Sequence, residues 1–122
     1  MVEPKKLAKS FDYAIQGIHY AFRNQQNVRI HVLAAILVIG AGIFFKINPF
    51  EMGIVAVMIL LVLVTEMINT AIEMMVDLIT KEHREEAKIA KDVASGMVLV
   101  TALGSIIVGI LIFLPYIIHY FS

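Results

Sequence analysis

Hydrophobic and polar positions alternate at helical spacing in the first part of the chain. In residues 5–24 the apolar side chains recur every three or four positions, with charged and amide residues between them. This period is typical of a helix with one apolar face. Because long apolar runs follow, we expect this helix to lie in the membrane interface, although a water-soluble amphipathic helix shows the same period. The apolar positions are Leu7, Phe11, Ala14, Ile15, Ile18 and Phe22.

Three later stretches contain no Asp, Glu, Lys or Arg: residues 30–45, 52–65 and 93–118. A helix needs about 20 residues to cross the hydrocarbon core of a bilayer. The first two stretches must therefore be extended by polar residues that face protein, and the third is long enough alone. The pattern predicts three membrane-spanning helices.

The expected spans cover about residues 28–46, 50–80 and 87–118, after a surface helix over about 5–24. Pro49 predicts a turn between the first two spans, and the charged segment "KEHREEAK" connects the second to the third. Pro115 is expected to mark the fraying end of the third span.

Composition supports this assignment and narrows the class. Hydrophobic residues make up 60% of the chain and charged residues 16%, an excess that a water-facing fold of this size would not carry. The net charge of zero gives no attraction to nucleic acid, and the absence of Cys excludes disulfides and thiolate zinc sites. The N-terminus shows no signal-peptide pattern. We expect an all-α membrane protein in which residues 1–122 form a single domain.

The basic residues predict the orientation. All of the lysines and arginines except Lys46 either lie before or at the start of the first span or fall in residues 81–91. Short segments rich in Lys and Arg stay on the cytoplasmic side. The N-terminus and the 81–91 segment are therefore expected in the cytoplasm and the C-terminus outside.

Acidic and amide residues form a stripe on the second span. At about 100° per residue, Glu66, Asn69, Thr70, Glu73 and Asp77 fall on one side of the helix. They cannot face lipid, where a charged residue costs at least ~2.5 kcal/mol on insertion scales. Two further polar sets are expected at the same depth: residues 23–31, and a group at the start of the third span. That group is Lys88, Lys91, Asp92 and Ser95.

Two interpretations of this polar level remain open from the residues alone. In the first, the charges are ion pairs at helix ends, with Lys91 neutralising Glu73 or Asp77. In the second, the carboxylates bind Mg²⁺, a lysine binds phosphate, and a remaining carboxylate accepts a proton, which together make a phosphoryl-transfer site. Glu66, the deepest carboxylate, is then the base candidate, and Glu73 suits the metal and nucleotide. No P-loop, Gly-rich GxGxxG or protein-kinase motif occurs.

The segments "EMINTAIEMMVDLIT" and "AKIAKDVASGMVLV" closely resemble the small prokaryotic diacylglycerol kinase and undecaprenol kinase family. The resemblance covers essentially the whole chain. It implies a homotrimer of three-span protomers in the bacterial cytoplasmic membrane, with active sites shared between neighbours. It also implies that ATP, with Mg²⁺, donates its γ-phosphoryl group to a lipid hydroxyl. The "RIH" and "VDLIT" sequences look more like the branch that favours undecaprenol, and the choice between undecaprenol and diacylglycerol stays open.

The same resemblance implies roles for individual residues. Glu66 matches the catalytic base, and Ser95 falls where the family contacts lipid. Glu73 matches a metal ligand. Other positions match residues that bind the nucleotide or order its site: Tyr13, Asn69, Lys91 and Asp92, with Glu82 and His83 in the loop that approaches it.

Gln25 departs from the family pattern, which places Glu four residues before the Arg of "RIH" and uses it to share the metal with the residue matching Glu73. An amide oxygen can coordinate Mg²⁺ only as a neutral ligand. We expect weaker Mg²⁺ binding or reduced turnover, or an inactivating change.

Two non-kinase hypotheses compete with this assignment. A small transporter or proton-relay oligomer could use Glu66 and Glu73, and a membrane scaffold would need neither. Lys91, Asp92 and Asn69 fit phosphate chemistry better than a conducting path. The charged residues also gather on one side of the membrane instead of lining a path across it.

Overall fold

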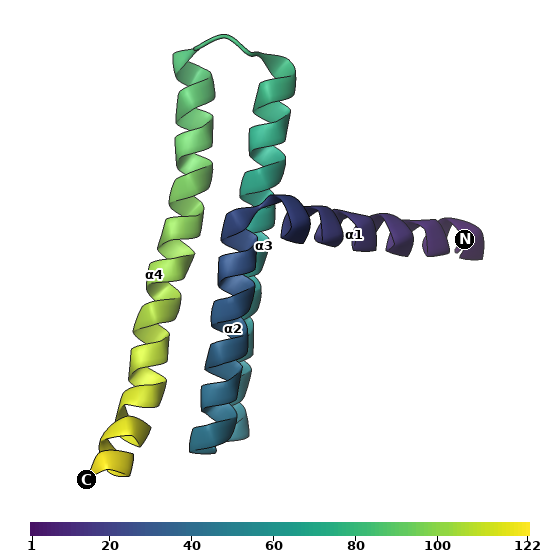
Figure 1. Cartoon of the computed structure of the whole chain (residues 1–122). Coiled ribbons are helices and arrows are strands. Elements are labelled where there is room, and N and C mark those ends of the chain that lie inside the picture. Colours follow the sequence, from purple (N-terminus) through teal and green to yellow (C-terminus); the bar gives the residue numbers. More distant parts are fainter.

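The computed structural model describes residues 1–122 and contains four helices and no strands. Figure 1 shows α1 running crosswise to the three other helices. By length and composition α2, α3 and α4 can each cross a membrane. The expected all-α class, with three candidate spans after an amphipathic helix, is confirmed. The helices are α1 (Pro4–Asn24), α2 (Gln26–Phe45), α3 (Pro49–Ile79) and α4 (Glu85–Phe121).

Helix α3 lies at the centre of the packing, with α4 along one side and α2 along another. Beyond the level of α1, α3 and α4 continue as a helical hairpin without α2 (Figure 1). Only 12 of the 122 residues are buried within the chain, and large apolar side chains are exposed along all four helices. Such a surface requires lipid or other subunits as its environment.

The turn between α2 and α3 is built by local capping. Lys46 adopts the left-handed conformation (φ 55°), and its N–H donates to the carbonyls at the end of α2. Asn48 caps α3: its side chain accepts from the Glu51 N–H at 2.8 Å, while the Glu51 carboxylate accepts from the Asn48 N–H. This capping box makes the start of α3 a defined position. Tyr116 of α4 donates to the same Glu51 carboxylate, which ties the two helices at this end.

The expectation that Pro115 marks the end of the third span is wrong, because α4 continues to Phe121 with Pro115 inside it. Proline removes one backbone donor, but packing of the following turn can outweigh this loss. The Tyr120 ring lies against Phe44 and Phe45 of α2, with ring centroids 5.7 and 6.0 Å apart. These contacts and the Tyr116–Glu51 bond hold the last turns in helical form.

Candidate active site

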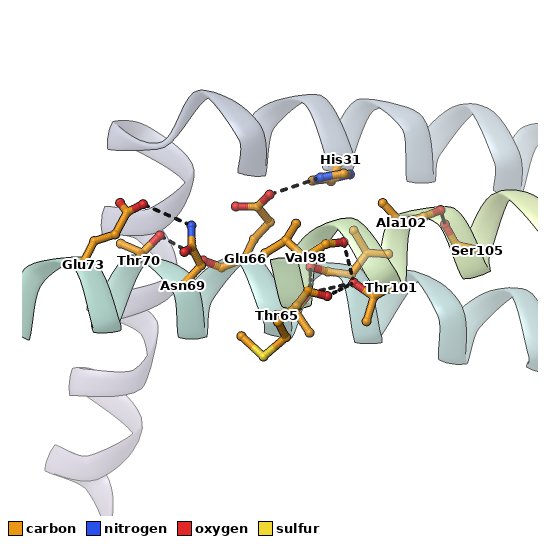
Figure 2. A network of polar contacts seen from close by, with 12 residues as sticks. His31, Thr65, Glu66, Asn69, Thr70, Glu73, Val98, Thr101, Ala102 and Ser105 are labelled. Carbon is orange, nitrogen blue, oxygen red and sulfur yellow. Dashed lines mark hydrogen bonds and ion pairs between the residues drawn. The ribbon is translucent and has the colours of Figure 1, made fainter. Parts of the chain in front are cut away.

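The buried polar residues of the chain are all on one segment of α3. They are Thr65, Glu66, Asn69 and Thr70. Glu66 is the most buried of them, at 3% exposure. Its Oε1 lies 3.3 Å from Nε2 of His31 on α2, and Figure 2 shows the two side chains pointing toward one another. A carboxylate at this depth requires such a partner, because burial without one is costly.

Asn69 lies one turn from Glu66, toward the cytoplasmic end expected for α3. Its Nδ2 donates to Oε1 of the half-buried Glu73 at 3.4 Å (Figure 2). Its Oδ1 is buried and has no hydrogen-bond partner. Buried polar atoms are nearly always satisfied, so this amide oxygen is open to a ligand, a water molecule or a neighbouring subunit. Amide and carboxylate oxygens are the donors that Mg²⁺ prefers, so Asn69 and Glu73 fit this ion chemically.

Threonine hydroxyls fix this segment of α3. The hydroxyls of Thr65 and Thr101 lie 3.0 Å apart across the α3–α4 interface (Figure 2). The Thr65 hydroxyl donates to the Val62 carbonyl and can then accept from Thr101, and Thr70 donates to the Glu66 carbonyl. The interhelical bond therefore sets the rotation of α3 against α4 at the residue that precedes Glu66.

A second polar cluster surrounds a cavity where α3 and α4 meet the connecting loop. Lys91 donates to Asp77 across the two helices, Lys88 to Asp92 along α4, and Arg84 to Glu82 within the loop. The lining of this cavity includes Asp77, Glu82, His83, Lys88, Lys91 and Asp92. The ion pair expected between Lys91 and Asp77 is present, and lysines and carboxylates share one solvent-facing hollow.

The remaining expected site residues are more scattered. Tyr13 is exposed on α1, and Ser95 is exposed on α4. Gln25 is half-buried at the corner between α1 and α2, where its N–H donates to Ala21 and its carbonyl accepts from the Arg29 N–H.

One chain does not bring all of these residues together. Glu66 and Glu73 line none of the main cavities, whereas Asp92 lines the cavity at the loop end. Nor do any three His, Asp or Glu side chains gather as a metal site within the chain. The site residues therefore form two clusters, one at Glu66 and one at the α3–α4 loop.

Sequence reasoning missed two contacts, His31 with Glu66 and Thr65 with Thr101. The polar segment 23–31, expected at the depth of the α3 stripe, was the signal for the first. Thr101 lies in an otherwise apolar run and gave no signal.

Comparison with known proteins identifies the family. The family model described as prokaryotic diacylglycerol kinase matches residues 12–113. A diacylglycerol kinase of Synechocystis sp. is 41% identical over 110 residues, which cover 89% of this chain and 63% of that protein. An undecaprenol kinase of Bacillus subtilis is 42% identical over 113 residues, covering 93% of this chain and 92% of that protein. A diacylglycerol kinase of Haemophilus influenzae is 32% identical over 109 residues, with 88% and 92% covered. The chain therefore belongs to the prokaryotic diacylglycerol kinase family, a family of lipid kinases.

Proposed function

We propose that the protein is an ATP- and Mg²⁺-dependent kinase that phosphorylates the hydroxyl of a membrane lipid at the cytoplasmic membrane face. The observation that carries this proposal is the buried Glu66 on a membrane-spanning helix, next to an amide oxygen that lacks a partner. The family relatives support the same chemistry. In this proposal a lipid hydroxyl reaches Glu66 from the bilayer, and a soluble nucleotide reaches the α3–α4 loop.

The reaction is a phosphoryl transfer with Glu66 as general base. Glu66 accepts the proton of the lipid hydroxyl while the hydroxyl oxygen forms a bond to the γ-phosphorus of ATP. The bond from that phosphorus to the bridging oxygen breaks, and ADP leaves. Lys88 and Lys91 bind phosphate oxygens. Their present partners Asp92 and Asp77 are exposed, and exposed ion pairs contribute little, so phosphate can replace them.

Asn69 and Glu73, with Gln25 as a third oxygen donor, are the residues that would hold Mg²⁺. The ion, when bound, neutralises negative charge on the phosphate oxygens. Two observations support this assignment. Oδ1 of Asn69 is buried without a hydrogen-bond partner, and the adjacent Glu73 supplies a carboxylate.

A homotrimer with shared sites would complete this arrangement. Within one chain the Glu66 cluster and the loop cluster have no common cavity, so a neighbouring subunit is proposed to bring the second cluster to the first. The extensive exposed apolar surface is consistent with such packing. Small residues on α2 and α4, such as Ala34, Ser105 and Gly109, allow close helix approach.

Undecaprenol is the first candidate acceptor and diacylglycerol the second. The relative named undecaprenol kinase matches over 92% of its length, and the relative of similar identity named diacylglycerol kinase over 63%. Rates on the two lipids, measured side by side in the same mixed micelles, decide between them.

The test of the proposed function is transfer of labelled γ-phosphate from ATP to lipid. Purified protein with ATP, Mg²⁺ and either lipid should give a labelled lipid phosphate. Glu66→Gln should lower kcat by about 10²- to 10⁴-fold, the usual range for loss of a general base. Glu3→Gln, a matched change at the exposed residue just before α1, should not. No labelled lipid with either acceptor rules out the kinase, and full rate in Glu66→Gln rules out the base assignment.

The structure gives the transporter or proton-relay alternative no support. A conducting path needs polar side chains along a whole span. On α4 the Ser105 hydroxyl donates to a carbonyl of its own helix, the Thr101 hydroxyl contacts Thr65, and the charged residues gather at the loop end.

A further inference from the structure

The imidazole of His31 is the one polar side-chain group that the structure places within ion-pair distance of the Glu66 carboxylate. Nε2 lies 3.3 Å from Oε1, and side-chain exposure is 24% for His31 and 4% for Glu66. Thr70, the other polar neighbour, donates to the backbone carbonyl of Glu66 and leaves its carboxylate free. The orientation of this carboxylate therefore depends on a residue of α2, not on its own helix.

His31 also borders a groove between α2, α3 and α4. The groove is apolar except for His31 and Ser105. His31 belongs to the second turn of α2, about 8 Å along the helix from the corner with α1. His31 thus touches both the buried carboxylate and the apolar groove.

We propose that His31 is a positioning residue for Glu66. An N–H of the imidazole holds one carboxylate oxygen, which leaves the other oxygen to face the acceptor hydroxyl. Without this contact the buried carboxylate would have no polar partner and no fixed orientation. Misplacement of a reacting group by about 1 Å can lower a rate by about a hundredfold. This inference rests on the proposed lipid kinase function.

A comparison of two substitutions tests the role. His31→Leu keeps bulk and removes the donor, and we expect kcat to fall by about tenfold to a hundredfold. KM for ATP should stay unchanged, because His31 is absent from the loop cavity that is proposed to bind the nucleotide. His31→Gln restores an N–H donor and should recover most of the lost rate. His119→Gln, at the exposed far end of α4, is the matched control and should leave kcat unchanged.

Thermal unfolding provides a readout that does not depend on activity. His31→Leu should lower the Tm of the wild-type chain, because it leaves a buried carboxylate without a partner. On a Glu66→Gln background the same change should have a much smaller effect, since no charge remains to be paired. This double-mutant cycle measures the coupling between the two side chains.

The outcomes separate this inference from the proposed function. Wild-type kcat in His31→Leu, or a rate in His31→Gln as low as in His31→Leu, overturns the positioning role and leaves the lipid kinase standing. Equal Tm losses on both backgrounds overturn the contact itself. Failure of the wild-type protein to phosphorylate any lipid overturns the proposed function and the inference with it.

Discussion

Asn69 combines burial with an incomplete set of hydrogen bonds. Its Nδ2 has one long bond to Glu73, and its buried Oδ1 has none. A buried polar atom without a partner costs about 1–3 kcal/mol in the free protein. Such a residue is better suited to binding a ligand than to stabilising the helix bundle.

Asn69→Leu should therefore separate activity from stability. We expect loss of ATP-dependent lipid phosphorylation together with an unchanged or raised Tm, because the substitution removes an unsatisfied amide of similar size. Phosphoryl transfer and thermal unfolding in the same detergent measure the two effects. A clear fall in Tm would show that the amide stabilises the fold. Thr65→Val removes a hydroxyl that does have hydrogen bonds, so its lower Tm shows the size of a destabilising change.

Gln25 stands where a metal-binding carboxylate is expected. Gln25→Glu should lower the Mg²⁺ concentration needed for half-maximal activity, because a carboxylate binds this hard cation more strongly than a neutral amide does. A Mg²⁺ titration of both proteins at saturating ATP measures the effect. Identical titration curves would show that the residue at this corner is not a metal ligand.

Helices α3 and α4 are joined by polar contacts at two levels. Thr65 meets Thr101 beside the proposed active site, and Glu51 accepts from Tyr116 at the opposite end. Between these levels the interface is formed by apolar residues such as Val55 and Ile112. The two contacts fix both the rotation and the axial register of the helix that carries Glu66.

Tyr116→Phe tests the contact at the far end. Loss of a hydrogen bond to a charged acceptor should destabilise the bundle by about 1–2 kcal/mol, with kcat little changed. Thermal unfolding in detergent measures the difference. Tyr120→Phe is the matched control, because Tyr120 packs by its ring and its hydroxyl has no hydrogen bond in the chain. Equal Tm values for the two variants would contradict the role given to the Glu51 contact.

The sequence sufficed for the helices and for the polar face of α3, because apolar runs and helical periodicity are local properties. It did not predict the partner of Glu66, since the contact with His31 depends on how α2 is rotated against α3. It also misplaced the end of α4, because Pro115 is a local signal that the packing of Tyr120 on α2 outweighs. The capping of α3 by Asn48 and Glu51 could have been predicted from their three-residue spacing.

The proposed active site must be assembled from two clusters that lie apart within the chain. One surrounds Glu66 among α2 and α3, and the other surrounds the α3–α4 loop cavity. Within a single chain, none of the main cavities connects the two clusters.

Mixing of inactive subunits tests whether the active site is shared. Glu66→Gln and Asp92→Asn chains should each be inactive alone, and co-expression should restore activity if neighbouring subunits supply the two clusters. The measurement is lipid phosphorylation by purified mixed oligomers, with each variant assembled alone as the control. Persistent inactivity of the mixture would place both clusters of a working site in the same chain.

The extension of the α3–α4 hairpin past the level of α1 has a kinetic consequence (Figure 1). In the proposed arrangement, ATP would reach the tip of this hairpin from the cytosol, while the lipid alcohol would diffuse sideways within the leaflet. Neither molecule obstructs the route of the other. Initial-rate measurements should therefore fit a random-order scheme, in which either substrate can bind first. Saturation with one substrate should not slow the binding of the other.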